Sequence, residues 1–427
     1  MTFNSISRLI IAGGTVLLLT TGAIAQSGAT RPRRVNPVRP ASRPESSAPA
    51  TTSTTTTTTD DSAAPNANVN AARPRTGNSV VGSDTASSAA GTRRAYDLLQ
   101  QKQYAAAARE AKQVAAGNPN DSEAWKIAGF AEINLKQYAE AAADLQRALD
   151  LQRAARQEDA NTVDALAQAY VLTEKFDQAL PLLVIATTRT GTAAPAPIMF
   201  YYRGVAEYQT GKAAEAERSF NQAVKANPKD AASLYYLGQL AFRGGRLDET
   251  IALLNRATLV DARIAPAWAL LTTAYLRRAA AATVEAKADA DYLSAVRAGE
   301  SLTRIRTDAD SATLFAQALI GAKQFARAAT VLERVTAGDD AKGVTLYLLG
   351  VAHSRAKNLP KAIAALERAA AKAPDDVNVY RELGYAYEVS KLYAKAFEAY
   401  QKGASLAPGE ADLAESVERV RPFAQKQ

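Results

Sequence analysis

The feature that most constrains this chain is a sequence repeat that recurs throughout residues 88–409. The residues that open successive units are separated by 34, 38, 37, 34, 34, 44, 34 and 34 positions. A period of this length is typical of stacked supersecondary units, each of which buries its apolar face only against its neighbours. The opening residues are Gly91, Trp125, Val163, Phe200, Leu234, Trp268, Ala312, Leu346 and Tyr380.

Within a unit, the apolar residues recur every three or four positions, which places them on one face of a helix. A large residue is followed by Leu and by Gly or Ala, and then by a helix-breaking turn. A second apolar run of the same spacing follows, and several units end in Pro and an acidic residue. Each unit is therefore predicted to be a pair of helices. The last unit shows the pattern with Tyr380, Leu383, Gly384, Tyr387, Tyr393, Ala396, Tyr400 and Pro408.

This pattern resembles the tetratricopeptide repeat, in an exported, bacterial-type chain, over nearly all of residues 88–409. The resemblance implies an all-α fold, a right-handed superhelical solenoid of about nine helix–turn–helix repeats. The units are expected to start near residues 88, 122, 160, 197, 231, 265, 309, 343 and 377. Residues 410–427 are predicted to form a C-terminal capping helix over the apolar edge of the last unit.

The small residues have a physical role in this pattern. Gly or Ala at the eighth position of a unit, as in Gly129 and Gly204, would let the two helices of a pair approach closely. Turns such as Asn-Pro-Asn-Asp121 would end one helix and supply an acidic cap for the next. The longest step, after Trp268, predicts longer helices, and whether they form a protruding contact element is left open.

Residues 1–25 predict a signal peptide. Arg8 precedes an apolar stretch that ends in Ala23-Ile24-Ala25, a site that a signal peptidase would cut before Gln26. An uncleaved N-terminal anchor is the alternative. The sequence thus predicts a periplasmic or secreted protein, with membrane contact only through an uncleaved N-terminus if at all. Residues 26–91 are rich in Pro, Thr, Ser and Ala and predict a disordered linker.

The net charge of +8 does not indicate nucleic-acid binding. Arg8 contributes +1, and seven arginines against four acidic residues give +3 in residues 26–91. The remaining +4 is spread over residues 92–427, which is too dilute for a phosphate-binding footprint.

No catalytic or cofactor-binding set is evident in the sequence. The chain has no Cys and a single His, His353, which is expected to pack between helices. Asp289, Asp291, Asp308 and Asp310 lack the Gly and the terminal Glu of a calcium loop. We therefore expect a non-enzymatic protein with no cofactor and no metal.

The resemblance also implies a partner-binding groove, because the first helices of successive units line a concave surface in this family. Tyr, Arg and Gln at the corresponding positions suit recognition, since they combine rigid apolar area with planar polar groups. The lysines and asparagines of the carboxylate clamp found in chaperone-binding arrays are not reproduced. The expected groove residues are Tyr201, Tyr208, Tyr235, Gln239, Phe242, Arg243, Arg277, Gln317, Tyr347, Arg355, Arg381 and Tyr385.

The leading functional hypothesis is a protein–protein interaction scaffold of the cell envelope that binds extended peptide segments of partner proteins. The alternative is a polysaccharide- or cell-wall-binding module, in which the groove aromatics would stack on sugar rings. Protein cross-linking and glycan binding would distinguish the two.

Overall fold

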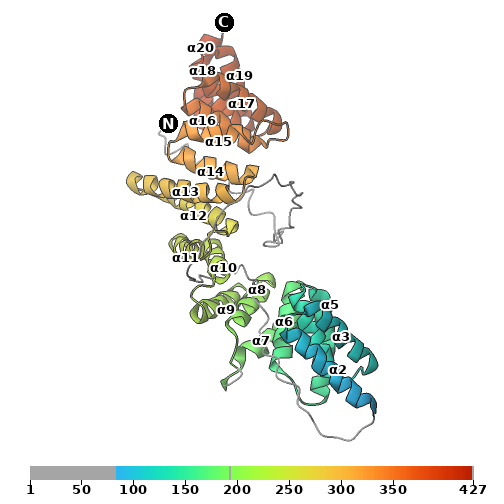
Figure 1. Cartoon of the computed structure of the whole chain (residues 1–427). Coiled ribbons are helices and arrows are strands. Elements are labelled where there is room, and N and C mark those ends of the chain that lie inside the picture. The colour runs from blue at the N-terminus through green and yellow to red at the C-terminus, as the bar shows by residue number, and fades with distance from the viewer. Residues whose placement is uncertain (1–82, 192–193, 426–427) are drawn as a thin grey trace, which may run out of the picture.

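The computed structural model describes residues 83–191 and 194–425, and within them all regular structure is helical. In this part of the chain, nine antiparallel pairs stack in chain order into an elongated array, and one further helix follows the last pair (Figure 1). This confirms the predicted all-α solenoid with a C-terminal cap. The pairs are α2 (Ser83–Gln100) with α3 (Tyr104–Gly117), α4 (Ser122–Asn134) with α5 (Tyr138–Ala154), α6 (Ala160–Leu172) with α7 (Phe176–Thr188), α8 (Pro197–Gln209) with α9 (Ala213–Ala226), α10 (Ala231–Arg243) with α11 (Leu247–Val260), α12 (Ala265–Ala281) with α13 (Glu285–Ile305), α14 (Ala309–Gly321) with α15 (Phe325–Glu333), α16 (Gly343–Arg355) with α17 (Leu359–Lys372), and α18 (Val377–Val389) with α19 (Tyr393–Leu406), followed by α20 (Ala411–Ala424).

Small residues set the spacing of the helices, as the sequence predicts. A Cβ atom added at Gly129 in α4 would lie 2.4 Å from Cγ of Leu145 in α5, and one added at Gly350 would lie 2.4 Å from Cγ of Leu366. Real Cβ atoms do not approach side chains so closely, so only glycine permits these helix pairs to pack at their observed separation.

The acidic caps expected after the Pro-containing turns are present. The Asp121 carboxylate accepts a hydrogen bond from the backbone N–H of Ala124 at 3.0 Å. Asp376 likewise accepts from the N–H of Asn378 at 2.9 Å. These bonds satisfy N–H groups that have no partner within the helix, and they fix where each first helix begins.

The apolar core of the described residues runs along the array in three sections, of which the second and third overlap in sequence. The first section spans residues 95–240, the second 242–298 and the third 265–420. Each section joins side chains of neighbouring pairs, so every unit depends on those beside it. The cap completes the core, because Leu413 of α20 is fully buried against the last pair.

The long step near Trp268 lies in longer helices, as expected. The helix α12 has 17 residues and α13 has 21, whereas α10 and α11 of the preceding pair have 13 and 14. In Figure 1 the α12–α13 pair extends beyond its neighbours. Arg278 ties this extension to the array, because its guanidinium binds Asp291 of α13 at 2.7 Å and Asp248 of α11 at 2.5 Å.

One predicted boundary needs correction. The helix α2 begins at Ser83, so residues 83–87, which the sequence analysis assigns only to the disordered linker, are helical together with residues 88–91, where the predicted linker and array overlap. The helix α2 packs on α3, and a Cβ added at Gly91 would lie 2.5 Å from Val114. The signal peptide and the rest of the linker lie outside the described residues. Among the described helices, none is both long and apolar enough to cross a bilayer.

Candidate functional site

Five of the expected groove residues form a connected surface on three consecutive first helices, α8, α10 and α12. We call these five residues the central first-helix face, and each of them is at least partly exposed. Its members are Tyr208, Tyr235, Gln239, Arg243 and Arg277.

A chain of hydrogen bonds runs across the central first-helix face. The Tyr208 hydroxyl donates to the Gln239 amide oxygen at 2.6 Å, and the Gln239 amide nitrogen donates to the Tyr235 hydroxyl oxygen at 3.3 Å. Because Tyr208 belongs to α8 and Gln239 to α10, the chain joins two units. It also fixes the orientation of both rings before any ligand binds.

Two arginine guanidinium groups lie over aromatic rings of the preceding unit. The Arg243 guanidinium lies 4.7 Å from the Tyr208 ring centroid, and the Arg277 guanidinium lies 4.3 Å from that of Phe242. Both distances are within the range of cation–π attraction. Arg243 and Arg277 occupy equivalent positions in successive units, and so do the two rings that they contact, Tyr208 and Phe242. The same arginine–aromatic contact therefore occurs twice in succession.

Beneath this surface lies an aromatic cluster that supports it. The Phe220 and Tyr236 rings stack at a centroid distance of 4.9 Å, and Tyr201, another expected groove residue, lies 6.2 Å from each of them. Desolvation raises the pKa of Tyr201 above its ordinary range, and it raises the pKa of Tyr235 to about 12. The hydroxyls of Tyr201 and Tyr235 are therefore neutral near pH 7.

Two predicted groove residues lie in the interior instead. Phe242 and Tyr347 are each only 7% exposed. Phe242 is covered by the Arg277 guanidinium, which a later unit supplies. Burial raises the pKa of Tyr347, and the nearby carboxylates of Glu382 and Asp376 raise it further. The residue type and position suggested exposure for both side chains, but neighbouring units cover them.

The expected groove residues near the C-terminus are mostly engaged within the protein. Arg355 donates to the buried carboxylate of Glu382 at 2.9 Å and lies over the Tyr385 ring at 5.2 Å. Arg381 binds Asp412 at 3.1 Å and also contacts Glu410. Arg381 therefore anchors the capping helix and is not free to bind a partner. Gln317 is half-buried.

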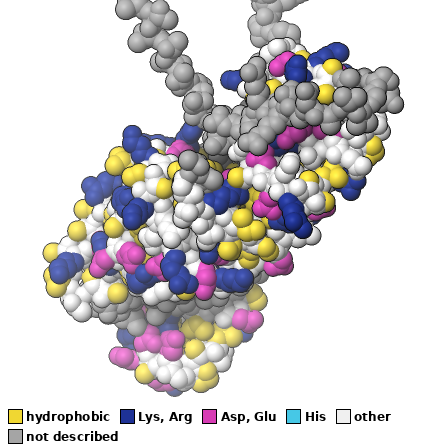
Figure 2. All heavy atoms as spheres, turned by 90° about the horizontal axis from the view of Figure 1, so that it is seen from below, with side chains coloured by type: hydrophobic (Ala, Val, Ile, Leu, Met, Phe, Trp, Pro, Cys, Tyr) yellow, Lys and Arg dark blue, Asp and Glu magenta, His cyan; other side chains and the backbone are white. Residues whose placement is uncertain are grey.

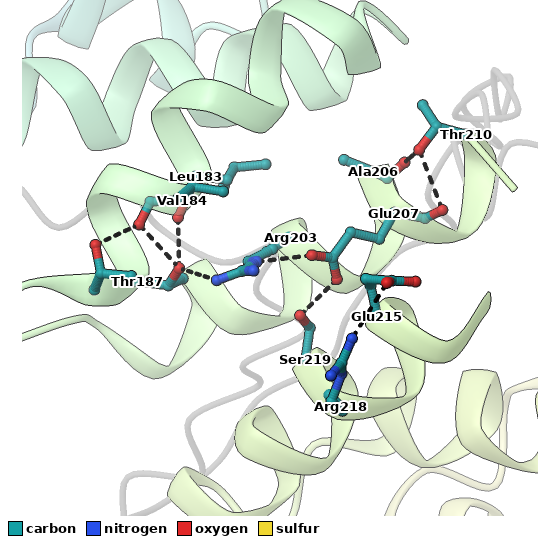
Figure 3. A network of polar contacts seen from close by, with 11 residues as sticks. Leu183, Val184, Thr187, Arg203, Ala206, Glu207, Thr210, Glu215, Arg218 and Ser219 are labelled. Carbon is teal, nitrogen blue, oxygen red and sulfur yellow. Dashed lines mark hydrogen bonds and ion pairs between the residues drawn. The ribbon is translucent and has the colours of Figure 1, made fainter. Parts of the chain in front are cut away.

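Sequence analysis missed a buried polar network between the third and fourth units (Figure 3). Arg203 of α8 donates to Thr187 of α7 at 2.9 Å and to Glu207 at 2.8 Å. Glu207, which is 3% exposed, accepts a second hydrogen bond from Ser219 of α9 at 2.6 Å. The spacing of Arg203 and Glu207 by four positions was the available signal, because such pairs face each other on a helix.

A second buried charge cluster lies near the N-terminal end of the array. Glu132 is 1% exposed and forms an ion pair with Lys112, which also lies 3.4 Å from Asp144. Desolvation raises the pKa of Glu132 to about 7 in spite of Lys112, and burial also raises the pKa of Asp144. Lys112 comes from α3, Glu132 from α4 and Asp144 from α5, so the cluster links two units electrostatically.

The other candidates for chemistry have structural roles. His353 is 6% exposed and lies 3.3 Å from Glu333, while desolvation lowers its pKa. Asp308 caps α14, and Asp291 is paired with Arg278. The described residues contain no cluster of three His, Cys, Asp or Glu side chains that could hold a metal ion. Acidic and basic side chains intersperse over the face drawn in Figure 2.

The stacked helical pairs define the class of this protein, a solenoid of helix–turn–helix repeats. Family models described as tetratricopeptide repeat match residues 92–159, 165–217, 207–267 and 319–384, which together make up more than half of the chain. The chain belongs to the tetratricopeptide repeat family. Proteins of this family are in general non-catalytic interaction scaffolds.

Three solved structures are similar to parts of this chain. A crystal structure of YrrB, titled a TPR protein with an unusual peptide-binding site, is 18% identical, with a TM-score of 0.39, over 48% of this chain and 99% of that one. MamA from Desulfovibrio magneticus is 23% identical, with a TM-score of 0.37, over 43% and 98%. The C-terminal part of a TPR repeat-containing protein from Cytophaga hutchinsonii is 15% identical, with a TM-score of 0.41, over 68% and 99%. No curated protein matches the chain.

Proposed function

We propose that this protein is a scaffold of the cell envelope that holds an extended segment of a partner protein against the central first-helix face. One observation carries the proposal. Tyr208, Gln239 and Tyr235 are fixed by hydrogen bonds across two units while remaining partly exposed. Preformed aromatic and amide groups of this kind lose little conformational entropy when a peptide binds.

An extended peptide suits this surface better than a compact ligand does. The face continues along three successive units, and Gln239 and the two tyrosines can bond to backbone amides of any sequence. Side-chain pockets are not required for such contacts. Arg243 and Arg277, which belong to this surface, make binding depend on the charge of the partner.

The proposal is tested by truncating two side chains of the central first-helix face. Tyr235→Ala combined with Arg243→Ala should abolish capture of partner proteins by in-cell cross-linking and mass spectrometry. Its helical circular-dichroism signal should stay near that of the wild type, because Arg243 is exposed and Tyr235 is only partly buried. A double variant that captures the wild-type set of proteins would refute the peptide-binding surface.

A control variant changes the opposite helix of the same unit. Arg256→Ala with Leu259→Ala alters two exposed side chains of α11, and Leu259 is 87% exposed. Partner capture should be unchanged in this variant. Binding of peptidoglycan or glycan arrays without protein cross-links would favour a cell-wall module and contradict the peptide-binding scaffold.

The envelope location rests on the sequence of residues 1–25, which lie outside the described part of the structure. Mass spectrometry of the exported chain should find an N-terminus at Gln26. A chain that keeps residues 1–25 and stays with the cytoplasmic fraction would contradict export.

A further inference from the structure

The central first-helix face carries positive charge from its arginines and no exposed negative charge from its own helices. The helices α8, α10 and α12 contain a single acidic residue, Glu207. Its carboxylate is 3% exposed and is already bound to Arg203 and Ser219. No exposed carboxylate of these three helices therefore balances the arginines on their surface.

Arg243 and Arg277 differ from most arginines of the array in their bonding. Among the residues that the structure describes, neither guanidinium has a carboxylate within ion-pair distance, and each is held only by an aromatic ring. The adjacent Arg278 shows the contrast, because it binds both Asp248 and Asp291. Desolvation lowers the pKa of Arg277, and no acidic neighbour raises it again.

A stacked guanidinium is well prepared to bind a carboxylate. The aromatic ring restricts the position of the guanidinium, while the N–H groups of the guanidinium remain free to donate. The Tyr235 hydroxyl accepts a hydrogen bond from Gln239, and within the described residues it has no acceptor for its own hydrogen. It can therefore donate to an anionic ligand near Arg243.

We propose that the central first-helix face recognises an acidic extended peptide, with Arg243 and Arg277 each binding a carboxylate of the ligand. This inference rests on the proposed function and specifies the partner's chemistry. The one-repeat separation of the two arginines calls for acidic side chains at two separated places in the peptide. The chain's own leader does not fit, because residues 26–91 carry a net charge of +3.

A random twelve-residue peptide library displayed on phage provides the test, with the full exported chain as the target. Peptides selected on the wild type should be enriched in Asp and Glu. Selection on the Arg243→Gln, Arg277→Gln variant should lose this enrichment. A synthetic peptide with the most enriched sequence should bind the variant at least 10-fold more weakly than the wild type in fluorescence anisotropy.

The matched control removes the same two charges from second helices of the same units. Arg256→Gln with Arg297→Gln should keep both the acidic enrichment and the wild-type affinity. Selected peptides without acidic enrichment, or equal enrichment on both double variants, would overturn the acidic-ligand inference and leave peptide binding intact. A library that yields no binding peptide would overturn peptide binding itself.

Discussion

Gly129→Ala tests whether close helix approach sets the geometry of the array. The new methyl carbon would lie 2.4 Å from Cγ and 2.9 Å from Cδ2 of Leu145. Leu145 is fully buried, so it cannot turn toward solvent to make room for the methyl group. Overpacking of a filled core costs about 1–3 kcal/mol, and this short approach puts the cost near the upper end.

The helix propensity of alanine works in the opposite direction. Replacing a mid-helix glycine by alanine stabilises a helix by about 1 kcal/mol. The net result for Gly129→Ala should therefore be a destabilisation of about 2 kcal/mol. Hydrogen exchange in α4 and α5 should measure it locally, because repeat arrays open in sections.

Two comparisons make the test decisive. Gly117→Ala, at a helical position with no atom within 4 Å of the new carbon, should leave stability unchanged or raise it. In a Leu145→Ala background the space is empty, so Gly129→Ala should cost nothing. The steric reasoning is refuted if Gly129→Ala behaves like Gly117→Ala, or if its cost persists without the Leu145 side chain.

Three further predictions concern charge, the cap and the turns. The pKa of Glu132 is about 7 in the folded protein, against 4.5 in the unfolded chain. Protonation of Glu132 therefore stabilises the fold by at most about 3 kcal/mol below pH 4.5, and this stabilisation is lost as the pH rises through 7. Urea unfolding from pH 4.5 to 8 should show the loss in the wild type and not in Glu132→Gln; equal profiles would contradict it. Leu413→Ala should cost about 2–4 kcal/mol and speed hydrogen exchange in α18 and α19 but not in α4. Asp376→Ala should cost about 1 kcal/mol in thermal unfolding, whereas Asp375→Ala at an exposed position should cost little.

The architecture could be predicted from the sequence because its determinants are local and periodic. Apolar spacings of three and four positions indicate helices, and the longer period indicates pairs and units, without any knowledge of tertiary contacts. Gly350 opposite Leu366 illustrates this, since both residues belong to one pair. The start of α2 was missed because its first residues, 83–87, are Ser, Asp, Thr and Ala and show no apolar periodicity.

The candidate surface could be predicted only in part. Position within the unit correctly brought Tyr208, Gln239 and Arg243 together, since these positions repeat with the helix. The same reasoning failed for Tyr347, which neighbouring units bury. The position of a residue in its helix indicates which way its side chain points, whereas the exposure of that side chain depends on which side chains of the neighbouring units cover it.

The sequence by itself determined the helices, their pairing and the caps, because each depends on residues within a single unit or the turn beside it. Only the tertiary structure decided which polar groups remain free to bind a ligand. Arg381 and Arg277 both lie on first helices. Arg381 forms an ion pair with Asp412 of α20, whereas among the described residues the Arg277 guanidinium contacts only the Phe242 ring. That difference arises between neighbouring units, where side chains from separate parts of the chain compete for the same partners.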